Sequence, residues 1–140
     1  MKLSRRMKAV LGLAALALVV APSAIAQPAG APALAARSND AGGIRVVVTP
    51  KSVAAGAAWQ FEVVMDTHIK PLDDDLTKTA ILVVDGGRQY APTSWQGDKP
   101  GGHHRKGVLS FPAPSELSKS FELVIQNLGG ITKRVFQWAK

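Results

Sequence analysis

The sequence contains three histidines, two of which are adjacent. His103 and His104 follow a pair of glycines, and His68 lies two residues after Asp66. Imidazole is the commonest metal ligand in proteins, and carboxylates often complete such sites. A set of His and Asp ligands without cysteine suits Cu(II) or Zn(II). We therefore take these four residues as candidate metal ligands, with copper or zinc as the candidate cofactor.

The backbone decides whether these side chains can meet. In an extended strand Asp66 and His68 share one face, with Cα atoms ~6.5 to 7 Å apart. Adjacent histidines point to opposite sides of an extended chain, so a shared metal requires a bend, which the preceding Gly101 and Gly102 allow. The alternative is that the histidines pack and form hydrogen bonds within a tight turn. The sequence leaves both interpretations open.

Arg105 and Trp95 are the other candidate binding residues in this stretch. The planar guanidinium of Arg105 could hold a carboxylate or phosphate, or it could tie its loop to the acidic turn at residues 73–75. The Trp95 ring could stack on a sugar or lie in the core. We favour the loop-tying and packing roles. No serine lies in a nucleophile elbow, so we predict that the protein is not an enzyme.

The N-terminus has the pattern of a bacterial secretory signal. Four basic residues precede the uncharged run 9–20, and Ala24-Ile25-Ala26 supplies a small-x-small cleavage pattern. The apolar run is about 12 to 14 residues long, short of the ~20 that span a bilayer. The sequence predicts a signal peptide at 1–26, a periplasmic or secreted product, and no stable membrane anchor after cleavage.

Residues 27–43 are mainly Pro, Ala, Gly, Ser and Asn. Such a segment has too few large apolar side chains to offset the entropy of ordering, which predicts a disordered linker. One domain is then expected at 44–140. The chain has no cysteine, so its core must hold the fold without disulfides.

Charge argues against nucleic-acid binding. Four of the 17 basic residues lie in the predicted signal, so 13 basic residues face 10 acidic ones and the exported chain carries a net charge of +3. No basic run with interleaved aromatics is present, and we expect no nucleic-acid partner.

Hydrophobic alternation predicts an all-β domain. Trp59, Phe61, Val63 and Met65 alternate with more polar residues, the pattern of a half-buried strand. Seven short strands and no long amphipathic helix predict an antiparallel β-sandwich, immunoglobulin-like in broad architecture, with a small barrel as the alternative. The acidic turn is expected to form a short helical turn capped by an aspartate. The strands are expected at 44–49, 59–66, 79–85, 88–91, 106–111, 121–126 and 131–138.

A combination of motifs resembles a known group of proteins. The motifs are Asp66-Thr67-His68, Trp95-Gln96-Gly97, the run from Gly101 to Leu109 that begins Gly-Gly-His-His-Arg, and Phe111-Pro112. Together they resemble small exported prokaryotic β-sandwich domains of unknown function. The resemblance covers nearly the whole domain, and it implies one compact domain without implying a chemistry.

These observations predict an exported binding or accessory module with a His/Asp transition-metal site. The alternative is a structural or protein-interaction β-sandwich that binds no metal and pairs with a protein partner in the cell envelope through its strand edges.

Overall fold

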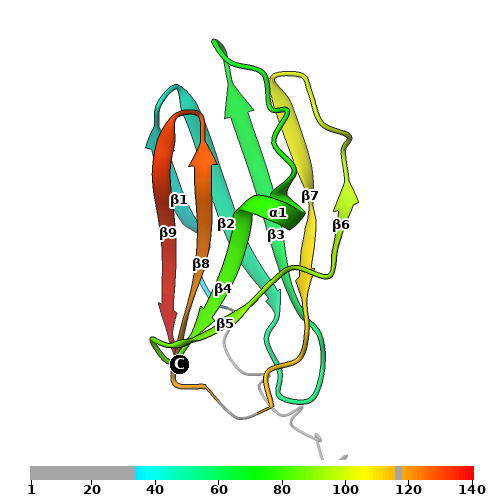
Figure 1. Cartoon of the computed structure of the whole chain (residues 1–140), viewed down its shortest axis with the longest axis vertical. Helices are drawn as coiled ribbons and strands as arrows, with labels where there is room; N and C mark the ends of the chain where they lie inside the picture. The colour runs from blue at the N-terminus through cyan, green and yellow to red at the C-terminus, as the bar shows by residue number, and fades with distance from the viewer. Residues whose placement is uncertain (1–33, 116–117) are drawn as a thin grey trace, which may run out of the picture. The chain divides into compact units, whose positions relative to one another are not determined.

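The strands predicted from alternation form two antiparallel sheets. The computed structural model describes residues 34–115 and 118–140, so the predicted signal peptide and residues 27–33 of the predicted linker lie outside the described residues. Figure 1 shows the sheets packed face to face, which confirms the predicted antiparallel β-sandwich. Within the described part of the chain, no helix is long and apolar enough to cross a bilayer.

The described residues form nine strands and one short helix. The five-stranded sheet has the order β1-β2-β3-β7-β6, and the four-stranded sheet has the order β5-β4-β8-β9. The elements are β1 (Arg37–Ala41), β2 (Ile44–Ser52), β3 (Trp59–Thr67), α1 (Leu76–Thr79), β4 (Ala80–Val84), β5 (Arg88–Tyr90), β6 (Ser94–Gly97), β7 (His104–Phe111), β8 (Ser120–Leu128) and β9 (Ile131–Ala139).

Two of these strands are absent from the prediction, and both are edge strands. Residues 37–41, predicted as part of a disordered linker, form β1 and pair with β2. Gly42 and Gly43 have φ of +59° and +75°, the conformation of a two-residue hairpin turn. Strand β6 pairs with β7 along the opposite edge of the same sheet. The structure therefore corrects both the strand count and the C-terminal limit of the linker.

Aromatic rings form the centre of the core. The Phe61 ring centroid lies 5.7 Å from that of Phe111 and 5.9 Å from those of Phe121 and Trp138. Trp59 packs edge-on against Phe121 at 5.0 Å. The aromatic face of β3 thus points inward, as its alternation predicts, and its polar face is left for the outer surface.

The acidic turn ends in the predicted capped helix. Asp75 is the N-cap of α1, and its carboxylate accepts hydrogen bonds from the main-chain N–H and the hydroxyl of Thr77. These hydrogen bonds, with a smaller contribution from Lys78, lower the pKa of Asp75. The predicted capping aspartate is confirmed.

Candidate functional site

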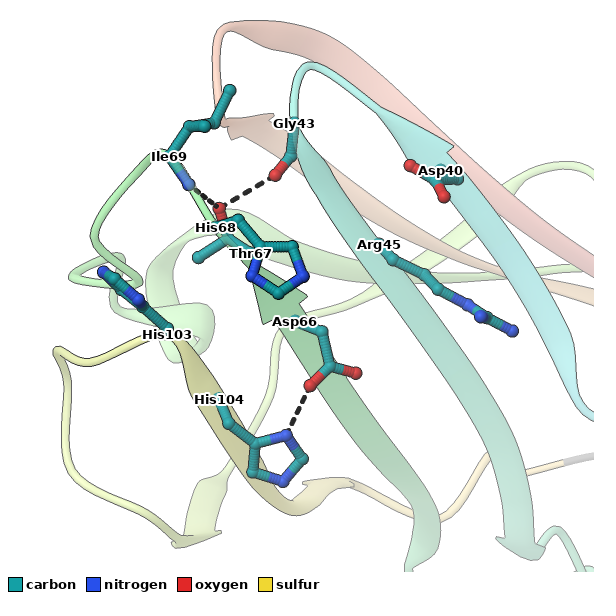
Figure 2. A pocket seen from close by; sticks show the side chains of 9 residues that line it. All are labelled: Asp40, Gly43, Arg45, Asp66, Thr67, His68, Ile69, His103 and His104. Carbon is teal, nitrogen blue, oxygen red and sulfur yellow. Dashed lines mark hydrogen bonds and ion pairs between the residues drawn. The ribbon is translucent and has the colours of Figure 1, made fainter.

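The pairing of β3 with β7 brings two of the predicted site residues together. The antiparallel register places Asp66 directly opposite His104, so both side chains point to the same outer face of the sheet. The Nδ1 atom of His104 lies 2.5 Å from Oδ1 of Asp66 (Figure 2). Both side chains are about half exposed to solvent. The site therefore contains a carboxylate–imidazole pair that is open to a ligand.

A pocket of about 760 Å³ lies at this end of the sheet. All four predicted metal residues line it, but no three His, Asp or Glu side chains among the described residues are grouped closely enough to hold a metal ion. In Figure 2 the His103 ring is turned away from the Asp66–His104 pair, whereas the His68 ring projects from the other side of Asp66. The pocket is lined by Asp40, Gly43, Arg45, Asp66, Thr67, His68, Ile69, His103 and His104.

Thr67 shapes the chain between Asp66 and His68. It is 3% exposed, and its hydroxyl donates to the carbonyl of Gly43 at 2.8 Å. The same oxygen accepts from the N–H groups of Ile69 and Lys70, so the chain turns directly after β3. His68 consequently lies in a turn beyond the strand, whereas the sequence predicts it on the strand face itself. Its position at the pocket depends on this hydroxyl.

A row of alternating charge crosses the outer face beside the pocket. Successive strand registers place Asp40 of β1 opposite Arg45, Arg45 opposite Asp66, and Asp66 opposite His104. Opposite residues of an antiparallel pair share a face, with Cβ atoms about 4.5–5.5 Å apart. The imidazole of His104 is therefore the last member of a row whose other three members carry charge.

Arg134 supports the pocket from inside the sandwich. It is 1% exposed, and its guanidinium donates to the carbonyls of Ala41, Ile44 and Leu128 and to the Asn39 side chain at 2.6–3.1 Å. Burial lowers the pKa of Arg134, and the negative charge of Asp40 partly offsets this effect. The contacts join the β1–β2 hairpin to the end of β8, which fixes one wall of the site.

The loop that carries the adjacent histidines is tied to the acidic turn. The N–H of Gly101 donates to the carbonyl of Leu72 at 2.9 Å, and the N–H of Leu72 donates to the carbonyl of Gly102 at 3.3 Å. Thr67 N–H donates to the carbonyl of His103, which extends the β3–β7 ladder by one bond. Gly101 and Gly102 have φ of +112° and +72°, so they supply the predicted bend.

Arg105 has the structural role favoured from its sequence position, with different partners. It is 2% exposed and donates to the main-chain carbonyls of Leu72, Asp74 and Asp98, rather than to a carboxylate. Its guanidinium carbon lies 4.9 Å from the centroid of the half-buried Trp95 ring. Neither residue lines the pocket, so neither is placed to bind a ligand there.

Close backbone approach explains the glycines that surround Trp95. Gly97 lies opposite Gly107, and a Cβ on Gly97 would clash with the Gly107 backbone. A Cβ on Gly107 would lie 2.5 Å from the Trp95 ring. The indole N–H of Trp95 also donates to the carbonyl of Asp98 at 2.9 Å. This part of the motif holds the edge strand in place.

Sequence reasoning missed three residues that shape the site. Arg45 lines the pocket, Thr67 forms the turn at its floor, and Arg134 joins two of its supporting turns. Only Arg134 carried a signal, because it shares the inward parity of Phe136 and Trp138. The roles of the others depend on strand register, which alternation alone does not define.

Comparison with known proteins identified no similar protein. No family model, no curated protein and no solved structure matches this chain.

Proposed function

We propose that this protein is an exported binding or accessory module, periplasmic or secreted, that binds a transition metal ion such as Cu(II) or Zn(II). The observation that carries the proposal is the Asp66–His104 pair at a pocket that His68 and His103 also line. These residues come from two segments that are far apart in the sequence, the end of β3 with the turn after it and the start of β7 with the residue before it. Their presence around one pocket supports a shared role.

The pair supports metal binding through the tautomer that it selects. A carboxylate accepts hydrogen bonds and does not donate them, so the proton in the short contact belongs to Nδ1 of His104. In the neutral imidazole the other nitrogen, Nε2, then carries a free lone pair. Carboxylate–histidine pairs of this kind orient metal-bound imidazoles in many proteins. In this proposal Asp66 orients His104, and Nε2 of His104 coordinates the metal; the turn that carries His68 has to move for that ring to join as a second ligand.

The same pair could in principle act as a general base, but the pocket favours binding. General-base chemistry on an ester or amide needs a nucleophile or an activated water close to the imidazole. Among the residues that line the pocket, the one hydroxyl is that of Thr67, which is buried and already bonded to Gly43. This arrangement supports a binding function over nucleophilic catalysis.

Isothermal titration calorimetry of the chain from Gln27 with zinc and with copper tests the proposal. We expect saturable binding of one ion that His104→Ala abolishes. Asp66→Asn should weaken binding by about 10- to 100-fold, because the imidazole loses its orienting partner. His103→Ala should have a smaller effect, since its ring is turned away from the pair. Heat no greater than that of a triple histidine-to-alanine variant would overturn the proposal.

A second candidate is a protein-interaction module that needs no metal. The Ile69 side chain, 72% exposed, projects at the rim of the pocket beside the row of alternating charge. An exposed aliphatic side chain next to charged groups suits a contact with an envelope protein. This candidate predicts partner binding that Ile69→Asp abolishes and that zinc or a chelator leaves unchanged.

A further inference from the structure

The opposite end of the sandwich carries a second, chemically different groove. It has a volume of about 670 Å³ and lies where β2 and β9 end, away from the pocket beside Asp66. Most of its lining is aliphatic or lysine, and no acidic side chain of the described residues contributes. The lining residues are Leu34, Lys51, Ser52, Val53, Ala54, Ala139 and Lys140.

Three lysines gather at this end. Lys51 and Lys140 line the groove, and the N–H of Lys140 donates to the carbonyl of the exposed Lys119 at 2.9 Å. The Lys140 ammonium donates to the carbonyl of Val53 at 2.8 Å and lies 4.8 Å from the Trp59 ring centroid. The groove is thus bordered by cations over an apolar floor.

Among the described residues, the acidic side chain of Asp85 at this end is already engaged. The Asp85 carboxylate accepts from the N–H groups of Lys119 and Ser120 and lies 3.2 Å from the guanidinium of Arg88. These contacts hold Asp85 against the protein. Among the described residues no carboxylate is paired with the ammonium groups of Lys51, Lys119 or Lys140, so their charge is available to attract an external anion.

The loop beside the groove is exposed and apolar. Residues 54–58 read Ala-Ala-Gly-Ala-Ala, and all five are exposed. A loop without polar side chains, next to cations, fits the boundary between lipid head groups and acyl chains. We propose that this end of the domain docks reversibly on an anionic lipid bilayer, with the lysines facing the head groups and Val53 and the loop lying at the interface.

The expected strength of membrane binding follows from the number of lysines at this end. A lysine near an anionic bilayer gains about fivefold in partitioning, the equivalent of about 1 kcal/mol, and the attraction decays over the Debye length. Three lysines therefore give salt-sensitive, reversible attachment rather than permanent anchoring. Replacing Lys51 and Lys119 by glutamate should lower partitioning about 25-fold or more.

Vesicle co-sedimentation tests the inference. The chain from Gln27 is used, because residues 1–26 are basic and apolar and would bind lipid themselves. We expect binding to mixed phosphatidylcholine–phosphatidylglycerol vesicles and none to pure phosphatidylcholine. The double variant Lys51→Glu/Lys119→Glu should lose binding at low salt while keeping the wild-type circular dichroism spectrum. Failure to bind the mixed vesicles, or equal binding to the neutral ones, would overturn the inference.

The matched control is Lys99→Glu/Lys133→Glu. These two lysines are exposed and lie toward the other end of the sandwich, in the loop before β7 and beside the β8–β9 turn. The control has the same net charge as the test variant but keeps the three lysines at the groove, so it should retain binding within about twofold. An equal loss in both variants would show that vesicle binding depends on the net charge of the protein and not on the lysines at this end. That result would refute the docking surface.

Discussion

Replacement of Arg105 tests how the loop of the candidate site is held. The guanidinium is buried and donates to three main-chain carbonyls from two separate segments. Arg105→Met keeps an apolar stem of similar length and removes every one of these donors. We expect the variant to fold with a lower free energy of unfolding and with a less ordered loop before β7.

The size of the effect follows from which carbonyls lose their last donor. Leu72 O keeps the N–H of Gly101, and Asp98 O keeps the indole N–H of Trp95. Only the 2.6 Å bond to Asp74 O has no substitute among the described contacts. A hydrogen bond from a charged donor contributes about 1.5–3 kcal/mol, and the cation–π contact adds about 0.5–1 kcal/mol. We therefore expect a loss of about 2–4 kcal/mol.

Urea denaturation followed by tryptophan fluorescence measures this difference. Arg45→Met is the matched control, because Arg45 is exposed on the same sheet and the structure gives it no hydrogen bond among the described residues. The control should stay within about 0.5 kcal/mol of the wild type. If Arg105→Met also unfolds within about 0.5 kcal/mol of the wild type, the buried guanidinium does not fasten the loop and our reasoning fails.

Two further predictions concern a close approach and a turn. Gly107→Ala places a methyl group against Trp95 and should lower the free energy of unfolding by about 1–3 kcal/mol. Gly87→Ala is the control, because nothing lies close to its Cβ, and it should leave the free energy of unfolding unchanged. Equal chemical-denaturation midpoints for the two variants would contradict this prediction. For Asp85, hydrogen bonds from the main-chain N–H groups of Lys119 and Ser120 lower the carboxyl pKa. Its stabilisation is therefore present above about pH 4 and lost as the pH falls. The difference in free energy of unfolding between wild type and Asp85→Asn should shrink as the pH falls from 7 to 3. A difference that stays constant with pH would contradict this role of the Asp85 carboxylate.

Seven of the strands could be predicted from the sequence, and the two edge strands of the five-stranded sheet could not. Strands such as β3 and β8 bury one face, so their apolar alternation is visible in the chain. Strands β1 and β6 are edge strands that bury little, and their sequences are largely polar. Main-chain pairing and the Gly42–Gly43 turn hold β1 in place, and these contribute no hydrophobic pattern.

The residue types of the candidate site could be predicted from the sequence, but their arrangement in space could not. Asp66 and His104 are 38 positions apart, and only the β3–β7 register places them opposite each other. A shift of one residue would turn the two side chains to opposite faces. The partners of Arg105 were equally hidden, because main-chain carbonyls have no sequence signature. The proposed division of roles, with Asp66 orienting and His104 coordinating, therefore depends on the structure.

Electron paramagnetic resonance of the Cu(II)-loaded protein tests the central claim most directly, because it detects nitrogen ligands on the metal. We predict nitrogen couplings from coordinated imidazole in the chain from Gln27, lost in the His68→Ala/His104→Ala double variant and retained in His103→Ala. Couplings that survive in the double variant, or a spectrum identical to that of copper in buffer, would contradict the assignment of this pocket as a metal site.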